Sequence, residues 1–381
     1  MKKQILLFIV AFVAFGLSQT IAQPTLTPKP LDATCIDLTD PLRPVPGNPY
    51  TYEVTIPNPP GGKSFRWFVT QDVTFITAGA VTATPQTVGG SILAAGEAHY
   101  NILTADADAI ELTWKSFVLN PGQYVFVVVY VENVDDCTTN NLKVYRIQPL
   151  HAFTLDIENM SWDGTAGTII ITDLEQCVDD VQSAVFDPDH GTDGGVVYDF
   201  GTNTLHYAVV AANFSGQFEL TAQISGLQDA TADETVGQSA TIYWGYTPNS
   251  ETYSIGPLTS AANGVTQDLG NVLAEELADF SGTIGEDGQM IYIKVVIEHN
   301  SFEAAANADE YLYTLAINGR LLDNTGAPLA SAADEDEFDD LHHEDCLPDL
   351  FTNDIVTQIL KARPTVQSVT PPPAGYLPIA P

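Results

Sequence analysis

The chain of 381 residues is apolar enough to fold and is strongly acidic. Hydrophobic residues make up 45% of it, which argues against a wholly disordered protein, and its length predicts two or three domains. The 49 Asp and Glu residues against 13 Lys and Arg give a formal net charge of −36. Such a surface repels phosphate backbones and anionic headgroups, so it argues against nucleic-acid partners and electrostatic membrane docking.

The N-terminus has the pattern of a secretory signal peptide. Lys2 and Lys3 precede the apolar run from Ile5 to Leu17, and the small-residue site at Ala22 follows. An apolar run of this length is too short to span a bilayer, so we predict cleavage after residue 22 and no membrane insertion. The expected location is extracellular or at the cell surface, with the periplasm as the alternative.

Residues 23–149 are predicted to form the first domain, a β-sandwich. Its N-terminal part, residues 24–49, is rich in proline and is expected to be extended. Short runs of alternating apolar and polar residues, separated by Gly and Pro turns, then predict strands. These runs are Tyr50–Ile56, Phe65–Val69, Ala109–Phe117, Tyr124–Glu132 and Leu142–Ile147.

Three of these strands also carry a family resemblance. The sequences FRWFV around Trp67, IELTW ending at Trp114 and GQYVFV from Gly122, followed by Cys137, resemble the PKD-like Ig-type repeat of exported Bacteroidota surface proteins. The resemblance covers about residues 50–148 and implies an Ig-like sandwich in a surface setting. It does not imply an antibody-like disulfide, because position 126 is Phe rather than Cys.

Residues 150–347 are predicted to form a second β-rich sandwich, which makes the fold class all-β with tandem Ig-like or PKD-like domains. Its clearest strand is Met290–Glu298, in which Ile291, Ile293, Val295 and Ile297 alternate with other residues. The segment Val272–Phe280 is predicted to be a short helix capped by Asn271. Residues 348–381 are predicted to be a Pro-rich tail.

The even number of cysteines predicts disulfides in an exported chain. The four cysteines are Cys35, Cys137, Cys177 and Cys346. Three connectivities are possible, and the pairs Cys35–Cys137 and Cys177–Cys346 would each stay within one predicted domain. Zinc is the weaker interpretation, because no C-x₂-C spacing is present.

One acidic loop is a candidate calcium site. Asp187, Asp189 and Asp193 alternate with other residues in a Gly-rich segment, where their oxygens could converge on a hard cation. The alternative is a solvated hairpin loop, since Asp and Gly are common turn formers. Weaker clusters occur at Asp106–Glu111 and at His342–Asp345, and no other cofactor is predicted.

Aromatic residues of the second domain allow a carbohydrate-binding alternative. Trp162, Trp244 and Tyr246 could stack on sugar rings, although large aromatic residues more often fill cores. Catalytic signatures such as G-x-S-x-G and H-E-x-x-H do not occur. The sequence therefore predicts a non-enzymatic structural or adhesive surface protein, with protein partners or self-assembly into a filament, and polysaccharide as the alternative partner.

Overall fold

The computed structural model describes residues 39–364 with gaps. The gaps are 57–62, 91, 97–102, 106, 116, 118, 120–121, 134–138, 151–152, 163, 165–167, 171–173, 191–194, 215, 230–235, 274–283, 286–287, 303–309, 323–325 and 328–353. Apart from the 3-10 turn η1 (Ser260–Ala262), the regular elements of the described residues are strands, which confirms the predicted all-β class. In this part of the chain, no helix has the length and apolarity needed to cross a membrane.

The first sandwich has the strand order of an Ig fold. Its three-stranded sheet runs β1 (Pro49–Glu53), β7 (Ala109–Trp114), β5 (Leu93–Gly96), and its four-stranded sheet runs β6 (Leu103–Ala105), β2 (Lys63–Thr70), β8 (Val125–Asn133), β9 (Asn140–Ile147). With β1 taken as strand B of an Ig domain, the first order is B-E-D and the second is C-F-G with β6 added beside strand C. The small hairpin β3 (Ile76–Thr77) and β4 (Ala80–Val81) follows β2, and the Tyr130 hydroxyl of β8 donates to Gly79 O at its turn.

Two fully buried tryptophans fill the core between these sheets. The Trp67 indole donates to Ala107 O at 2.9 Å, and the Trp114 indole donates to the Tyr52 hydroxyl at 3.1 Å. That hydroxyl in turn donates to Pro41 O at 2.6 Å. Each buried indole N–H thus has an acceptor, which removes the cost of burying an unpaired donor.

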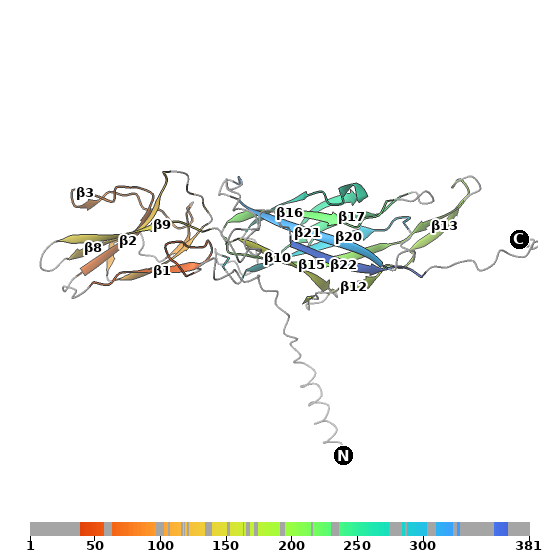
Figure 1. The fold of residues 1–381 in the computed structure, drawn as a ribbon, viewed down its shortest axis with the longest axis horizontal. Coiled ribbons are helices and arrows are strands. Elements are labelled where there is room, and N and C mark those ends of the chain that lie inside the picture. Colours follow the sequence, from red (N-terminus) through yellow and green to blue (C-terminus); the bar gives the residue numbers. More distant parts are fainter. Residues whose placement is uncertain are drawn as a thin grey trace, which may run out of the picture.

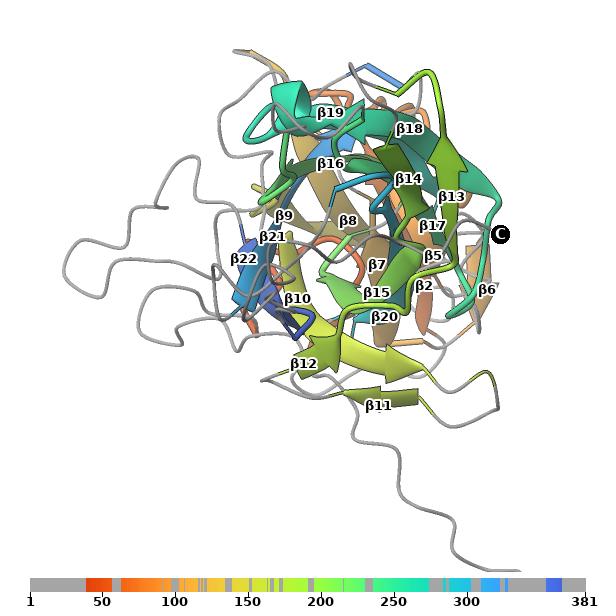
Figure 2. The ribbon, with the colours of Figure 1, turned by 90° about the vertical axis from the view of Figure 1, so that its right-hand side faces the viewer.

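The second sandwich has two larger sheets, seen end-on in Figure 2. One runs β11 (Thr168–Ile170), β10 (Thr154–Trp162), β15 (Thr202–Ala212), β20 (Gln289–Glu298), β17 (Ser239–Gly245), β18 (Tyr253–Thr259). The other runs β12 (Leu174–Cys177), β22 (Asp354–Lys361), β21 (Glu310–Leu322), β16 (Gln217–Ser225), β19 (Gln267–Leu273). Apolar side chains from both sheets, including the alternating residues of β20, form one core.

Two sequence predictions need correction in this sandwich. The predicted tail begins too early, because β22 pairs parallel with β12 and antiparallel with β21. Gln358 and Leu360 of β22 are completely buried, and Gln358 donates to His206 O at 2.8 Å. The predicted helix is also wrong at its start, where Val272 lies in β19 and is buried in the core, while residues 274–280 lie outside the described part.

The two sandwiches lie end to end and give an elongated body (Figure 1). The segment 41–48, part of the predicted extended region, lies between them. Gly47 N–H donates to Trp114 O in the first sandwich, and Asn48 donates through its side chain to Asn213 Oδ1 in the second. Gly47 has a φ of +87°, and a methyl group there would overlap the carbonyl of Ile284. Glycine is therefore required at this junction.

The position of β22 gives a test of the second sandwich. We expect Leu360→Ala to lower the free energy of unfolding by about 2–5 kcal/mol, because it leaves a cavity in a fully buried position. Ile355→Ala in the same strand, where the side chain is 63% exposed, should change it by less than about 0.5 kcal/mol. Chemical denaturation measures both, and equal effects of the two substitutions would contradict the placement of β22.

Candidate interaction surfaces

The hairpin β13 (Ser183–Asp187) and β14 (Gly195–Asp199) projects from the end of the second sandwich (Figure 1). Phe186 pairs with Val196 and Ala184 pairs with Tyr198, so these four side chains lie on one face. Phe186 is 62% exposed, and Val196 and Tyr198 are each about two-fifths exposed. An exposed apolar face of this kind is typical of a protein interaction site.

The base of the hairpin is held firmly to the sandwich. Tyr198 stacks on Phe200 with ring centroids 5.2 Å apart, and the Arg363 guanidinium lies 4.7 Å from the centroid of the same Phe200 ring. Arg363 also donates to Asp179 O and Phe200 O, each at 2.6 Å. The apolar face is therefore presented from a fixed base.

Two of the three candidate calcium residues, Asp187 and Asp189, lie at the turn of this hairpin. The Asp187 carboxylate accepts the backbone N–H of Asp189 at 2.9 Å, which is the pattern of an Asx turn. Asp193 and residues 342–345 lie outside the described residues, as does Asp106. Among those that are described, no three His, Cys, Asp or Glu side chains gather as metal ligands. Calcium binding at this loop therefore stays a prediction.

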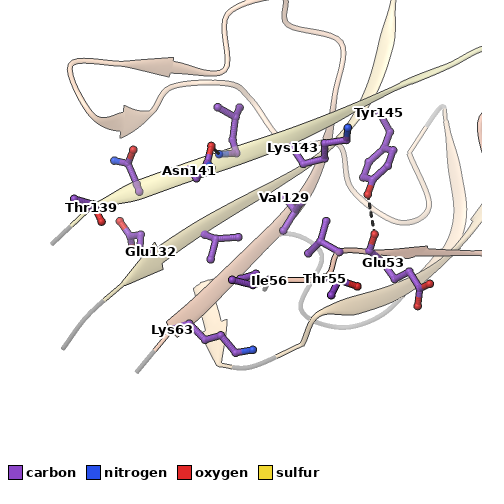
Figure 3. A pocket seen from close by; sticks show the side chains of 14 residues that line it. Glu53, Thr55, Ile56, Lys63, Val129, Glu132, Thr139, Asn141, Lys143 and Tyr145 are labelled. Atoms are coloured by element: carbon purple, nitrogen blue, oxygen red, sulfur yellow. Dashed lines mark hydrogen bonds between the residues drawn. The ribbon is translucent and has the colours of Figure 1, made fainter. Parts of the chain in front are cut away.

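A groove lies in the first sandwich between the edge strands β1 and β9 (Figure 3). The Tyr145 hydroxyl donates to Glu53 O at 2.7 Å and bridges the two sheets at one side of it. The groove has a volume of about 640 Å³. Apolar and charged side chains both line it: Val54, Ile56, Val129, Val131, Leu142 and Tyr145 among the first, and Glu53, Lys63, Glu132 and Lys143 among the second.

The predicted sugar-stacking residues do not form a platform. Trp244 is 1% exposed, and its indole N–H donates to Leu269 O at 2.7 Å. Its ring stacks on that of Tyr253, with the ring centroids 4.2 Å apart. The prediction that Trp244 could stack on a sugar is therefore wrong, because its ring is buried in the core and no sugar can reach it. Tyr246 lies edge-on to Trp244, whereas Trp162 lies on β10, which two other strands, β15 and β20, separate from β17 in the same sheet.

The predicted disulfides stay predictions. Cys177 ends β12 and is exposed, and it forms no disulfide with another residue that the structure describes. Its expected partner Cys346 lies outside the described residues, as do Cys35 and Cys137.

A buried polar network lies beneath the hairpin end of the second sandwich and was not predicted. His299 is fully buried; its Nε2 lies 2.7 Å from Asn203 Oδ1 and its Nδ1 lies 2.8 Å from Gln238 Nε2. The Tyr313 hydroxyl donates to Gln238 Oε1 at 3.0 Å, and Asn203 donates to Cys177 O. Gln238 must then donate to Nδ1, so the network fits a neutral imidazole with its proton on Nε2.

Burial keeps both core histidines neutral. Desolvation lowers the pKa of His299 to about 4, helped by Arg363, and desolvation together with Lys294 lowers the pKa of His206 to about 4. An unfolded histidine has a pKa near 6.5. The unfolded chain therefore binds more protons than the folded chain between these two values, so stability is complete above pH 6.5 and falls as the pH drops toward 4.

On acidification from pH 7 to pH 4, His299 is protonated in the unfolded chain before it is protonated in the folded chain. We expect this difference to lower the free energy of unfolding by about 3 kcal/mol. Carboxylates also titrate there, so the measurement compares the pH dependence of urea unfolding in the natural chain and in His299→Gln. The variant should be less stable at pH 7 and should lose less stability on acidification. The control is His190→Gln, at the hairpin turn outside the core, which should keep the natural slope. An unchanged slope in His299→Gln would contradict this role.

No family model matches the chain, and no curated protein matches it. Among solved structures it is similar to CfaE, the adhesive subunit of the CFA/I fimbria of enterotoxigenic Escherichia coli, with 10% identity and a TM-score of 0.28 over 87% of this chain and 86% of that one. It is also similar to BspA_C_mut, with 9% identity and a TM-score of 0.20 over 66% of this chain and 58% of that one.

A third similar structure is the full-length major pilin RrgB from Streptococcus pneumoniae, with 10% identity and a TM-score of 0.19 over 74% of this chain and 50% of that one. The chain thus spans about half the length of the pilin. TM-scores this low transfer no function, and the PKD-like resemblance stays a prediction beside the Ig-like strand order that the first sandwich shows.

Proposed function

We propose that this chain is an exported, non-enzymatic structural or adhesive protein that works as a subunit of a protein assembly at the cell surface. The observation that carries the proposal is the exposed apolar face of the β13–β14 hairpin, in which Phe186 is 62% exposed. Apolar side chains gathered on one projecting face are costly to leave in water, and a protein partner can cover them.

The charge of the chain supports a specific rather than a general association. A net charge of −36 makes most surfaces of two copies repel each other. Contact is then favoured only where apolar area is large and charges are few or opposite in sign. The hairpin face and the groove between β1 and β9 are surfaces of this kind, and both stand at strand edges of a β-sandwich.

The export part of the proposal rests on the predicted signal peptide, which lies outside the described residues. The PKD-like resemblance agrees with a surface setting, and we include it in the proposal. A polysaccharide partner has no comparable support, because Trp244 is enclosed in the core.

Sedimentation velocity of residues 23–381 over a range of concentrations tests the proposal. We expect species larger than a single chain to form reversibly as the concentration rises, because apolar surface is removed from water on association. The same concentration series is measured with added calcium and with a chelator, to show whether the predicted calcium site affects association. A chain that stays monomeric in every condition would contradict a self-assembling subunit.

A further inference from the structure

We propose that copies of this chain join head to tail, with the apolar face of the β13–β14 hairpin of one copy seated in the groove between β1 and β9 of the next. This inference rests on the proposed function and specifies its partner, a second copy of this chain. Four features support it: the positions, side chains and strand edges of the two surfaces, and the distribution of charge along the chain.

The two surfaces lie at opposite ends of the molecule. In the second sandwich, β15 runs from Thr202, beside the base of the hairpin, to Ala212, next to the junction residue Asn213. In the first sandwich, β9 runs from Asn140 at the groove to Ile147, which leads into the junction. Figure 1 shows the hairpin at the end remote from the first sandwich. A contact between them within one chain is therefore impossible, whereas a contact between two copies is not.

The side chains of the two surfaces complement each other. The hairpin offers a projecting apolar face, while Asp187 and Asp199 lie on its opposite face with Val185 and Asp189 lies at its turn. The groove offers an apolar floor, and its charged side chains are Lys63 and Lys143 together with Glu53 and Glu132 (Figure 3). Seating the hairpin would bury apolar area on both sides, in a groove whose two Lys and two Glu side chains carry no net charge.

Strand edges add a backbone contribution. In the described sheets, β1 pairs only with β7, and β9 pairs only with β8. Likewise β13 and β14 pair only with each other, so each has an outer edge. A strand that reaches an open edge can continue the sheet with main-chain hydrogen bonds. The groove lies between two such edges, which suits the docking of a hairpin.

Charge favours head-to-tail over symmetric contacts. Residues 39–150 contain 6 Lys and Arg against 10 Asp and Glu, a net charge of −4, whereas residues 151–381 contain 4 against 37, a net charge of −33. Two hairpin ends facing each other would bring together the two more acidic halves, residues 151–381 of each copy. A hairpin end facing a groove end avoids this repulsion. Such a heterologous contact leaves a free surface at each end of a pair, so it can continue into a chain of copies.

Four matched substitutions test the inference. Phe186→Asp places a charge on the apolar hairpin face, and its control Val185→Asp adds the same charge at an adjacent residue of the opposite face, which is 61% exposed. Leu142→Asp places a charge in the groove, and its control Val73→Asp adds one at an exposed residue that does not line it. All four side chains are exposed to solvent in one copy, so folding should be preserved, which circular dichroism checks.

We expect Phe186→Asp and Leu142→Asp each to raise the dissociation constant for self-association about tenfold or more, since each would bury an unpaired carboxylate, while the two controls keep the natural value. A mixture of the two disruptive variants should form dimers and nothing longer. In that mixture, the intact hairpin of Leu142→Asp can still occupy the intact groove of Phe186→Asp, and both remaining ends are blocked.

Other results separate the two proposals. If the natural chain assembles and neither disruptive variant weakens assembly more than its control, the head-to-tail contact is wrong and the proposed function stands. If Phe186→Asp is monomeric while Leu142→Asp still dimerises, the hairpins contact each other and the inference is wrong. If the natural chain never assembles, both proposals are overturned.

Discussion

The contact between Gly47 and the second sandwich is the constraint on which the arrangement of this molecule depends. A side chain at this position would overlap the carbonyl of Ile284, so the close approach of the two sandwiches requires glycine. The neighbouring bond between Asn48 and Asn213 ties the same segment to the end of β15. Since β15 then runs eleven residues away from the junction, at about 3.3 Å per residue, the hairpin is carried far from the groove.

The two ends differ because burial and charge are distributed differently along the chain. Both sandwiches have ordinary cores, in which each buried indole of Trp67, Trp114 and Trp244 has a hydrogen-bond acceptor. On the Phe186 face of the hairpin, the apolar side chains of Phe186, Val196 and Tyr198 remain exposed. Residues 151–381 carry most of the acidic excess of the chain, and this negative charge opposes unspecific association of the second sandwich.

Much of the fold could be predicted from the sequence because strand alternation is a local property. The alternating isoleucines and valines of β20 gave the right strand and the right buried face. β22 was missed because DIVTQILK is short and stands next to proline-rich sequence, and its burial comes from β12 and β21, which are remote in the chain. The start of the helix predicted from Val272 was wrong for a related reason, since pairing of β19 with β16 outweighs local helix propensity there.

The interaction surfaces could not be predicted, because exposure is not a local property. The segments AVF and VVY of the hairpin strands have the composition of core strands, and nothing in them shows that the hairpin extends beyond both sheets. The groove depends on the separation of β1 from β9, two strands about ninety residues apart. Open edges and exposed apolar faces are liabilities in an isolated β-sandwich. A contact between one end of this molecule and the opposite end of another copy would bury both the open strand edges and the exposed apolar face. The negative charge of the second sandwich would oppose contacts between two second sandwiches.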